Sequence, residues 1–163
     1  GQCFGFIFKE PARRPFLNDK ASELGVPPGP ERRELVMGNS IQLPDGQTID
    51  PDDVLGPVIP GTKLVHVGDA GTTDDLMEYC NNADALVIEA TYLEGDKLLA
   101  ERFGHLTACQ AAELAREANV NSLYLTHISR RYRTRDVLSE AAEVFPTVVV
   151  ARDLDRFQVK RHN

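Results

Sequence analysis

The chain has 163 residues, of which 42% are hydrophobic and 26% are charged; these values are typical of one globular domain and exclude a wholly disordered or fibrous protein. Its formal net charge of −7 at pH 7 argues against a broadly basic nucleic-acid binder, although local basic patches stay possible. We expect no membrane contact, because no apolar run approaches the roughly 18 residues that span a bilayer and no signal-peptide pattern is visible.

The first predicted element is a strand over residues 2–8, which read QCFGFIF. The chain has no initiator methionine and starts within this strand. Because a natural terminus rarely lies inside a strand, we expect the chain to be the C-terminal part of a longer polypeptide.

A proline-rich stretch follows. Residues 10–61 contain nine of the ten prolines, which disfavour a central strand or a long helix because proline lacks an N–H donor. We expect a long structured loop with one short helix over residues 18–24, capped by Asn18. A small hairpin is expected around Pro44-Asp45-Gly46. Loops of this length in compact domains tend to be functional or mobile.

From residue 62 onward, strand patterns alternate with helix patterns, which predicts an α/β fold with helices packed on a sheet. Thr107 and Gln110 fit a T-x-x-Q capping box that opens a helix to about residue 118. The predicted strands span residues 63–67, 85–88, 123–125, 147–151 and 157–160. The predicted helices run from Thr72 or Thr73 to Cys80, over residues 96–103, over residues 107–118, and onward from Thr134.

Polar side chains that can bind a metal or move a proton follow the predicted strands. Asp69, Glu89 and His127 come directly after strands, and His105 stands just before the capped helix. Because the carboxyl ends of parallel strands meet at one edge of a sheet, we expect these side chains to lie together. Taken singly, each has a structural alternative as a turn residue, a helix cap or a hydrogen-bonded buried group.

Asp69 and His127 carry the donor atoms of zinc ligands, and Glu89 could orient His105 beside a metal. Two ligands do not hold a catalytic zinc ion, and the sequence contains no HxH, HxxxH or HExxH motif. The three cysteines form no CxxC pair, which disfavours a cysteine zinc site and a disulfide framework. We therefore expect an incomplete metal site and a cytoplasmic or other reducing intracellular compartment.

Four arginines lie just beyond His127, at positions 130, 131, 133 and 135. Beside a metal ligand they would suit a phosphate-bearing substrate. The alternative is a solvated lead-in to the following helix. An acidic body with local basic contacts favours a selective RNA enzyme over a general nucleic-acid coat.

Four motifs in this order resemble the C-terminal half of the ribonuclease Z family. They read Val67-Gly68-Asp69, Ile88-Glu89-Ala90-Thr91, Gly104-His105-Leu106-Thr107 and Leu125-Thr126-His127-Ile128-Ser129-Arg130-Arg131-Tyr132. The resemblance covers essentially all of residues 1–163. It implies that they form the C-terminal part of a single domain, half of a metallo-β-lactamase-type αβ/βα sandwich, with a long Pro-rich substrate-binding arm at about residues 10–61.

The resemblance also implies an activity and a role for each site residue. The activity is zinc-dependent removal of 3′ trailers from tRNA precursors. Asp69 would bridge two zinc ions, His127 would be a terminal zinc ligand, and His105 would protonate the leaving group with support from Glu89. The implied substrate-binding residues are Ser129 and Arg131 near the site and Pro28, Gly29 and Pro30 in the arm.

The family's HxHxDH motif, which supplies further zinc ligands, is absent from this chain. We therefore expect the isolated chain to be inactive, and the resemblance implies a homodimer for the complete enzyme. Two alternatives remain at this stage. One is another metallo-β-lactamase-fold hydrolase that acts on a small phosphodiester or thioester, and the other is a non-catalytic RNA-binding half.

Overall fold

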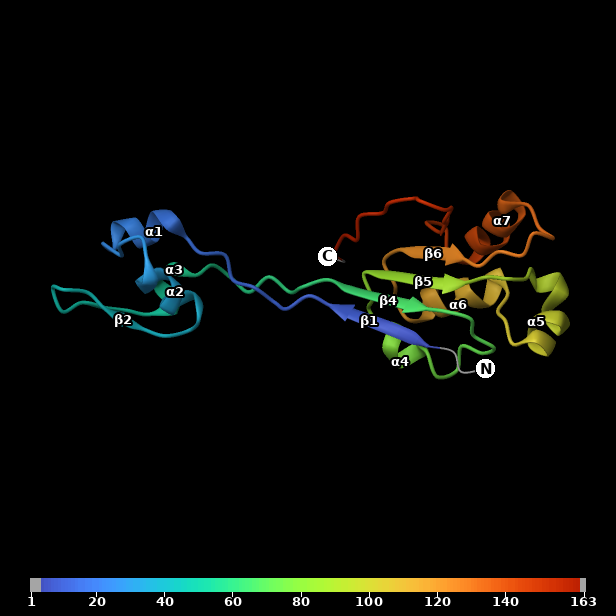
Figure 1. The fold of residues 1–163 in the computed structure, drawn as a ribbon, viewed down its shortest axis with the longest axis horizontal. Coiled ribbons are helices and arrows are strands. Elements are labelled where there is room, and N and C mark those ends of the chain that lie inside the picture. Colours follow the sequence, from blue (N-terminus) through green and yellow to red (C-terminus); the bar gives the residue numbers. More distant parts are fainter. Residues whose placement is uncertain (1–3, 162–163) are drawn as a thin grey trace. The chain divides into compact units, whose positions relative to one another are not determined.

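The computed structural model describes residues 4–161. They divide into two compact units (Figure 1): a sheet unit of residues 4–10 and 62–161, and a Pro-rich unit of residues 11–61. Gln2 and Cys3 of the first predicted strand lie outside the described residues. Within residues 4–161, none of the helices combines the length and the apolarity that crossing a bilayer requires.

The sheet unit is built on a five-stranded mixed sheet in the order β1-β4-β5-β6-β7. β1 runs antiparallel to β4, whereas β4, β5, β6 and β7 run parallel. Helices lie in the connections between the parallel strands, which confirms the predicted α/β fold class. The strands are β1 Gly5–Lys9, β4 Lys63–Val67, β5 Ala85–Glu89, β6 Leu123–Thr126 and β7 Val149–Val150.

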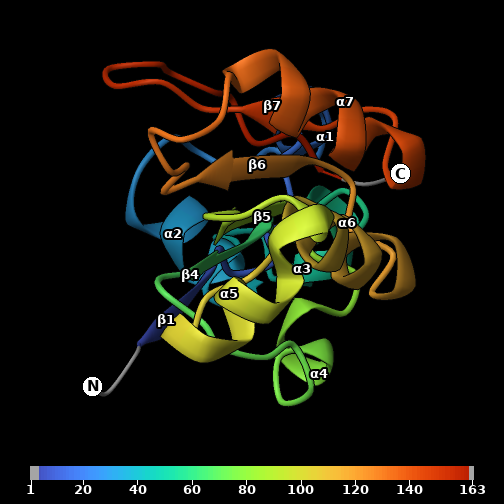
Figure 2. The ribbon, with the colours of Figure 1, turned by 90° about the vertical axis from the view of Figure 1, so that its right-hand side faces the viewer.

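Helices cover one face of this sheet. α6 packs against β5 and β6, α7 packs against α6, and Figure 2 shows α4 and α6 on the same side of the strands. Alternate strand residues, among them Val65, Leu86, Ile88 and Leu125, are buried in the core beneath these helices. The elements are α4 Met77–Cys80, the 3-10 turn η1 Glu94–Asp96, α5 Lys97–Phe103, α6 Ala108–Glu117 and α7 Thr134–Val144.

The start of α6 confirms the predicted capping box. The Thr107 hydroxyl accepts the N–H of Gln110 at 3.1 Å, and the Gln110 side chain accepts the N–H of Thr107 at 2.9 Å. Each bond satisfies a donor that the first helical turn leaves without a partner in the helix. The loop that carries His105 therefore ends at a fixed helix start.

Three other predictions for the sheet unit are wrong. The helix expected from Thr72 or Thr73 is only α4, because the Thr72 hydroxyl accepts the N–H of Asp74 at 3.2 Å in a local turn. The sequence also favours Thr134 as the cap of the last helix, but α7 begins at Thr134 itself and has Arg133 at its N-cap position. Residues 157–160 form no strand; instead the Phe157 ring packs on Tyr124, with ring centroids 4.5 Å apart.

Replacing Thr107 with valine is expected to lower the free energy of unfolding by about 1–3 kcal/mol, because the Gln110 N–H and the Glu94 carboxylate lose their hydrogen bonds to a buried hydroxyl. Thr107 is fully buried, and its hydroxyl also donates to the Glu94 carboxylate at 2.7 Å. Urea denaturation followed by circular dichroism measures the change. Thr107→Ser keeps the hydroxyl and should lose less; equal losses would contradict the importance of the cap.

The Pro-rich unit has a small core of its own. Its elements are α1 Asn18–Glu23, α2 Pro30–Val36, β2 Ile41–Gln42, β3 Thr48–Ile49 and α3 Pro51–Val54. Ala21, Val26, Leu35, Ile49 and Val54 are among the residues buried between them. The stretch predicted as a structured loop is therefore a folded unit.

Two details of the Pro-rich unit differ from the sequence predictions. α1 has Leu17 rather than Asn18 at its N-cap position, whereas the hairpin of β2 and β3 is confirmed. α2 and α3 are two further short helices that the sequence analysis did not predict in this stretch, where it expected no long helix. Pro30 and Pro51 begin these helices, where the missing N–H would have no partner in the helix anyway.

Two arginines hold the Pro-rich unit together. Arg14 donates to the backbone carbonyls of Gly56 at 2.8 Å and Leu55 at 3.2 Å. Arg32 donates to the carbonyls of Val26 at 2.9 Å and Pro27 at 3.1 Å. In each of the two adjacent arginine pairs, Arg13-Arg14 and Arg32-Arg33, one side chain is thus bonded within the folded unit.

Candidate metal centre

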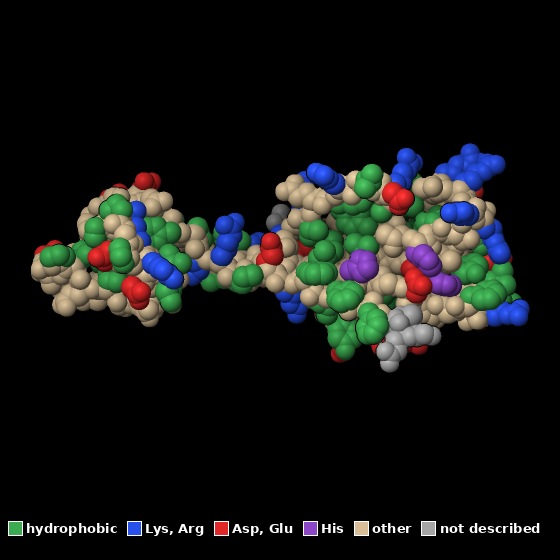
Figure 3. Space-filling view, viewed as in Figure 1, with side chains coloured by type: hydrophobic (Ala, Val, Ile, Leu, Met, Phe, Trp, Pro, Cys, Tyr) green, Lys and Arg blue, Asp and Glu red, His purple; other side chains and the backbone are tan. Residues whose placement is uncertain are grey.

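The four predicted site residues converge at the carboxyl-end edge of the parallel strands. Asp69 follows β4, Glu89 is the last residue of β5, and His127 follows β6. His105 comes from the loop between α5 and α6. Each offers one possible ligand atom, and these atoms lie within 4.8 Å of one another. Figure 3 shows histidine and acidic side chains gathered on this part of the sheet unit.

Glu89 lies beneath the cluster and is only 1% exposed. Its Oε1 atom accepts the N–H of Ala70 at 2.8 Å and lies 2.9 Å from Nδ1 of His105. Its Oε2 atom accepts the N–H of Thr91 at 3.2 Å and the Thr91 hydroxyl at 2.5 Å. These donors satisfy a carboxylate that would otherwise be costly to bury. Because the carboxylate only accepts, Nδ1 of His105 carries a hydrogen.

Asp69 and His127 form the open side of the cluster. Each side chain is 53% exposed, and Nδ1 of His127 lies 3.3 Å from Oδ1 of Asp69. His127 has φ of +54°, a left-handed conformation that is uncommon for residues other than glycine. The rings of His105 and His127 are 5.3 Å apart. Backbone strain of this kind concentrates at functional sites.

The loops that carry Asp69 and His105 approach each other closely at two glycines. A Cβ atom at Gly71 would lie 3.3 Å from the Cα of Gly104. Gly104 ends α5 with φ of +72°, which glycine adopts at little cost. Leu106, two residues beyond Gly104, is fully buried in the core and anchors the loop.

Thr91, part of the Ile88-Glu89-Ala90-Thr91 motif, is a further member of the cluster for which no role was predicted. It is only 8% exposed, and its hydroxyl lies 2.9 Å from Nδ1 of His127 as well as 2.5 Å from Glu89. A signal for it was present in the sequence. Glu89 ends a strand, and residues two apart in extended chain point to the same side.

The arginine-rich segment after His127 is fixed by an acidic partner on η1. Arg131 lies 3.5 Å from the Asp96 carboxylate, and its guanidinium stands 5.9 Å from the Tyr92 ring. Tyr132 donates its hydroxyl to the same carboxylate. Burial and this bond raise the pKa of Tyr132, so the phenol stays protonated. The Ser129 hydroxyl accepts the N–H of Arg131 at 3.4 Å, and the substrate roles of Ser129 and Arg131 stay predictions.

The remaining predicted binding residues belong to the Pro-rich unit. Pro28, Gly29 and Pro30 are all exposed, and Gly29 has φ of +142°. Pro30 begins α2. Their proposed contact with RNA also stays a prediction.

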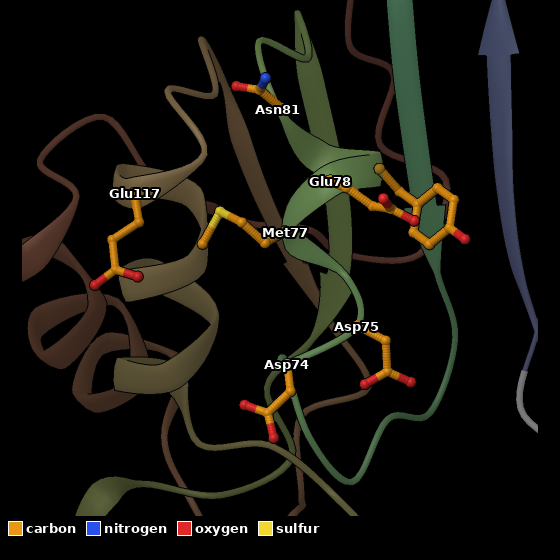
Figure 4. Close-up of a pocket in the computed structure, with 7 residues that line it drawn as sticks. Asp74, Asp75, Met77, Glu78, Asn81 and Glu117 are labelled. Carbon is orange, nitrogen blue, oxygen red and sulfur yellow. The ribbon is translucent and has the colours of Figure 1, made fainter.

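A hollow of about 550 Å³ beside α4 and α6 is separate from the cluster (Figure 4). Figure 4 shows Met77 between the two helices and Glu117 on α6. The lining residues are Asp74, Asp75, Met77, Glu78, Tyr79, Asn81 and Glu117. This hollow includes none of the four converging site residues, so the candidate centre is the strand-end cluster.

Residues 34–128, more than half of the chain, match the family model of the beta-lactamase superfamily domain. The chain belongs to the beta-lactamase superfamily. Within this superfamily it is 51% identical over 156 residues to a protein named ribonuclease Z from Bradyrhizobium diazoefficiens, covering 96% of this chain and 52% of the relative. It is 44% identical over 156 residues to a ribonuclease Z from Archaeoglobus fulgidus, covering 94% of this chain and 51% of the relative.

The superfamily fold is also found in a solved structure. The metallo-beta-lactamase fold protein YhfI from Bacillus subtilis aligns with a TM-score of 0.53 and 26% identity, covering 56% of this chain and 37% of YhfI. The resemblance to ribonuclease Z and the metallo-β-lactamase fold are thereby confirmed. The chain spans about half the length of the curated relatives it matches.

Proposed function

We propose that this chain is the C-terminal part of a zinc-dependent endoribonuclease that removes 3′ trailers from tRNA precursors. The observation that carries the proposal is the convergence of Asp69, Glu89, His105 and His127 within 4.8 Å at one edge of the sheet. Its support from the comparisons is 51% identity to a protein named ribonuclease Z.

The donor set fits zinc. Asp69 and His127 expose a carboxylate and an imidazole on the same side of the cluster, and both groups are common zinc ligands. The two zinc ions of the complete enzyme would activate a water molecule and stabilise the charge that builds on the phosphate. The remaining ligands would come from the part of the relatives' length that this chain does not cover.

His105 would act on the substrate. Its Nδ1 atom is held by the buried Glu89, so Nε2 is the atom that can carry a proton to the leaving oxygen. Arg131 would bind a substrate phosphate, because Asp96 and Tyr92 hold its guanidinium while its side chain stays 53% exposed. Hydrolysis of the phosphodiester would leave a 3′-hydroxyl on the tRNA.

The face of the sheet that α6 leaves open supports the domain assignment. Phe6 pairs with His66, His66 with Val87, and Val87 with Tyr124 in one row across the strands. Phe6 is 57% exposed, and Figure 3 shows hydrophobic side chains grouped on this face. We expect the uncovered half of the relatives' length to supply the layer that buries these side chains in a four-layer sandwich.

The Pro-rich unit would be the substrate-binding arm. It carries five Lys or Arg and eight Asp or Glu, so its net charge does not attract RNA. Contacts with RNA would be local, through Pro28, Gly29 and Pro30 and through the exposed Arg13 and Arg33. The homodimer rests on the resemblance to ribonuclease Z, and the cytoplasmic location rests on the three cysteines, which suggest no disulfide framework.

The complete gene product tests the function directly. With zinc bound, it should cut a 3′-extended tRNA precursor endonucleolytically, and a chelator should abolish the cut. Cleavage of only a small phosphodiester or thioester would identify another hydrolase of this fold. Binding of the precursor without cleavage would identify a non-catalytic RNA-binding protein. Either outcome would overturn the proposal.

The isolated 163-residue chain is expected to bind zinc weakly or not at all. Asp69 and His127 supply two exposed ligands, whereas a zinc site needs at least three protein ligands. Isothermal titration calorimetry with zinc measures this. His127→Ala serves as the comparison. A tight, stoichiometric site that survives this substitution would contradict the ligand assignment.

A further inference from the structure

We propose that Thr91 is a positioning residue that fixes the tautomer of His127 and so leaves its Nε2 atom free to bind metal. The proposal deepens the proposed function, from which it takes only that His127 is a metal ligand. It concerns a hydroxyl that links the two histidines of the cluster through Glu89.

The hydrogen-bonding capacity of the Thr91 hydroxyl decides the direction of each bond. The oxygen lies 2.5 Å from Oε2 of Glu89, 2.9 Å from Nδ1 of His127 and 3.0 Å from the His127 carbonyl. A hydroxyl has one hydrogen to donate and two lone pairs to accept. The Glu89 carboxylate and the His127 carbonyl can only accept hydrogen bonds. They therefore compete for the single hydrogen of the Thr91 hydroxyl.

Glu89 is the better acceptor for that hydrogen. It is the nearest partner, and a hydrogen bond to a carboxylate is about twice as strong as one between neutral groups. Glu89 is also 1% exposed, so water does not compete for the bond. Once the hydroxyl donates to Glu89, its oxygen accepts from Nδ1 of His127. That nitrogen carries the hydrogen, and Nε2 is left with its lone pair.

Asp69 favours the same tautomer but holds it less firmly. Its Oδ1 atom lies 3.3 Å from Nδ1 of His127 and can only accept. Asp69 is 53% exposed, so water competes with this contact, whereas Thr91 is 8% exposed. If Asp69 served as a metal ligand, Thr91 would remain as the partner of Nδ1 of His127.

In this arrangement the Glu89 carboxylate orients both histidines of the cluster. Oε1 of Glu89 bonds His105 directly, and Oε2 reaches His127 through Thr91. Loss of the Thr91 hydroxyl should therefore disturb His127 while the bond between Glu89 and His105 remains. The weak 3.5 Å contact of Thr91 with Nδ1 of His105 adds little to this bond.

Nitrogen-15 NMR of the imidazoles in the metal-free complete gene product tests the proposal. Unsubstituted His127 should show the Nδ1–H tautomer at a pH where the ring is neutral. Thr91→Val, nearly the same shape without the hydroxyl, should give a mixture of tautomers for His127 and leave His105 unchanged. Thr91→Ser should keep the single tautomer, because it keeps the hydroxyl.

Zinc titration of the same proteins gives a second readout. Thr91→Val should weaken zinc binding about 10–100-fold, the usual effect of losing a partner that orients a ligand, and Thr91→Ser should restore it. Thr126→Val is the matched control, since within residues 4–161 the Thr126 hydroxyl bonds the Ile88 carbonyl, at 3.3 Å, and neither histidine of the cluster. It should change neither readout.

Two results would overturn the proposal. One is an Nε2–H tautomer for His127 in the unsubstituted protein, a result that does not depend on any variant folding. The other is unchanged zinc affinity and an unchanged tautomer in Thr91→Val. Neither measurement uses RNA. A protein that fails to cleave tRNA precursors would therefore refute the proposed function, while the tautomer and the zinc affinity would still test this inference separately.

Discussion

Replacing residues 12–60 with a short Gly-Ser linker is expected to weaken binding of a tRNA precursor by the complete enzyme about tenfold or more, or ~1.4 kcal/mol of binding free energy. Hydrolysis of a small phosphodiester should persist. The reason is that the Pro-rich unit has a separate core and contributes none of the four converging residues. Precursor binding measured by filter retention, beside turnover of the small substrate, gives both quantities.

The structure shows where the deletion can close without disturbing the sheet. β1 ends at Lys9 and β4 begins at Lys63. Next to these strand ends, Glu10 and Thr62 are hydrogen-bonded to each other. The N–H of Glu10 donates to the Thr62 carbonyl at 2.9 Å, and the Thr62 hydroxyl donates to the Glu10 carboxylate at 2.6 Å. A linker that starts after Pro11 keeps both bonds.

Point variants separate RNA contact from loss of the fold. Arg13→Ala and Arg33→Ala change exposed side chains and should weaken precursor binding while the unit stays folded. Arg14→Ala should unfold the unit, because this side chain bonds Gly56, Leu55 and Asp52. If the deletion lowers both activities equally, the unit supports the catalytic core instead of the substrate.

The parts of the fold with local determinants could be predicted from the sequence. Residues 63–67 form a strand as predicted, with Val65 and Val67 buried in the core. α6 starts directly after Thr107, as the capping box predicts. The convergence of Asp69, Glu89 and His127 followed from one rule, that parallel strands share a carboxyl-end edge.

Other features depend on partners distant in the sequence and could not be predicted. Thr72 can cap a helix or close a turn, and nothing local decides between them. The position of Thr91 beside Glu89 could be predicted from their spacing, but its contact with His127, 36 positions away, could not. Arg14 and Arg32 bond backbone carbonyls that come together only in the folded unit, so the sequence does not indicate these partners.

His127→Ala and His105→Ala are expected to inactivate the complete enzyme in different ways. His127→Ala should lower zinc content and activity together, because an exposed ligand on the open side of the cluster is lost. His105→Ala should leave zinc content near that of the unsubstituted enzyme and lower turnover roughly 10²–10⁴-fold, the usual reach of general acid–base catalysis. Metal analysis beside single-turnover kinetics measures both effects.

Glu89 contacts His105 directly and His127 through Thr91. Glu89→Gln should therefore lower turnover and zinc content to values between those of the two histidine variants. The amide keeps the shape of the carboxylate but replaces one acceptor oxygen with a donor, so it cannot accept from Ala70, His105 and Thr91 together. Turnover should fall less than in His105→Ala, because the imidazole remains. Zinc content should also fall somewhat, because Thr91 loses its carboxylate acceptor and then orients His127 less firmly. If His105→Ala instead loses zinc as fully as His127→Ala, then His105 is a metal ligand, and the bond from its Nδ1 atom to Glu89 orients that ligand rather than a proton donor.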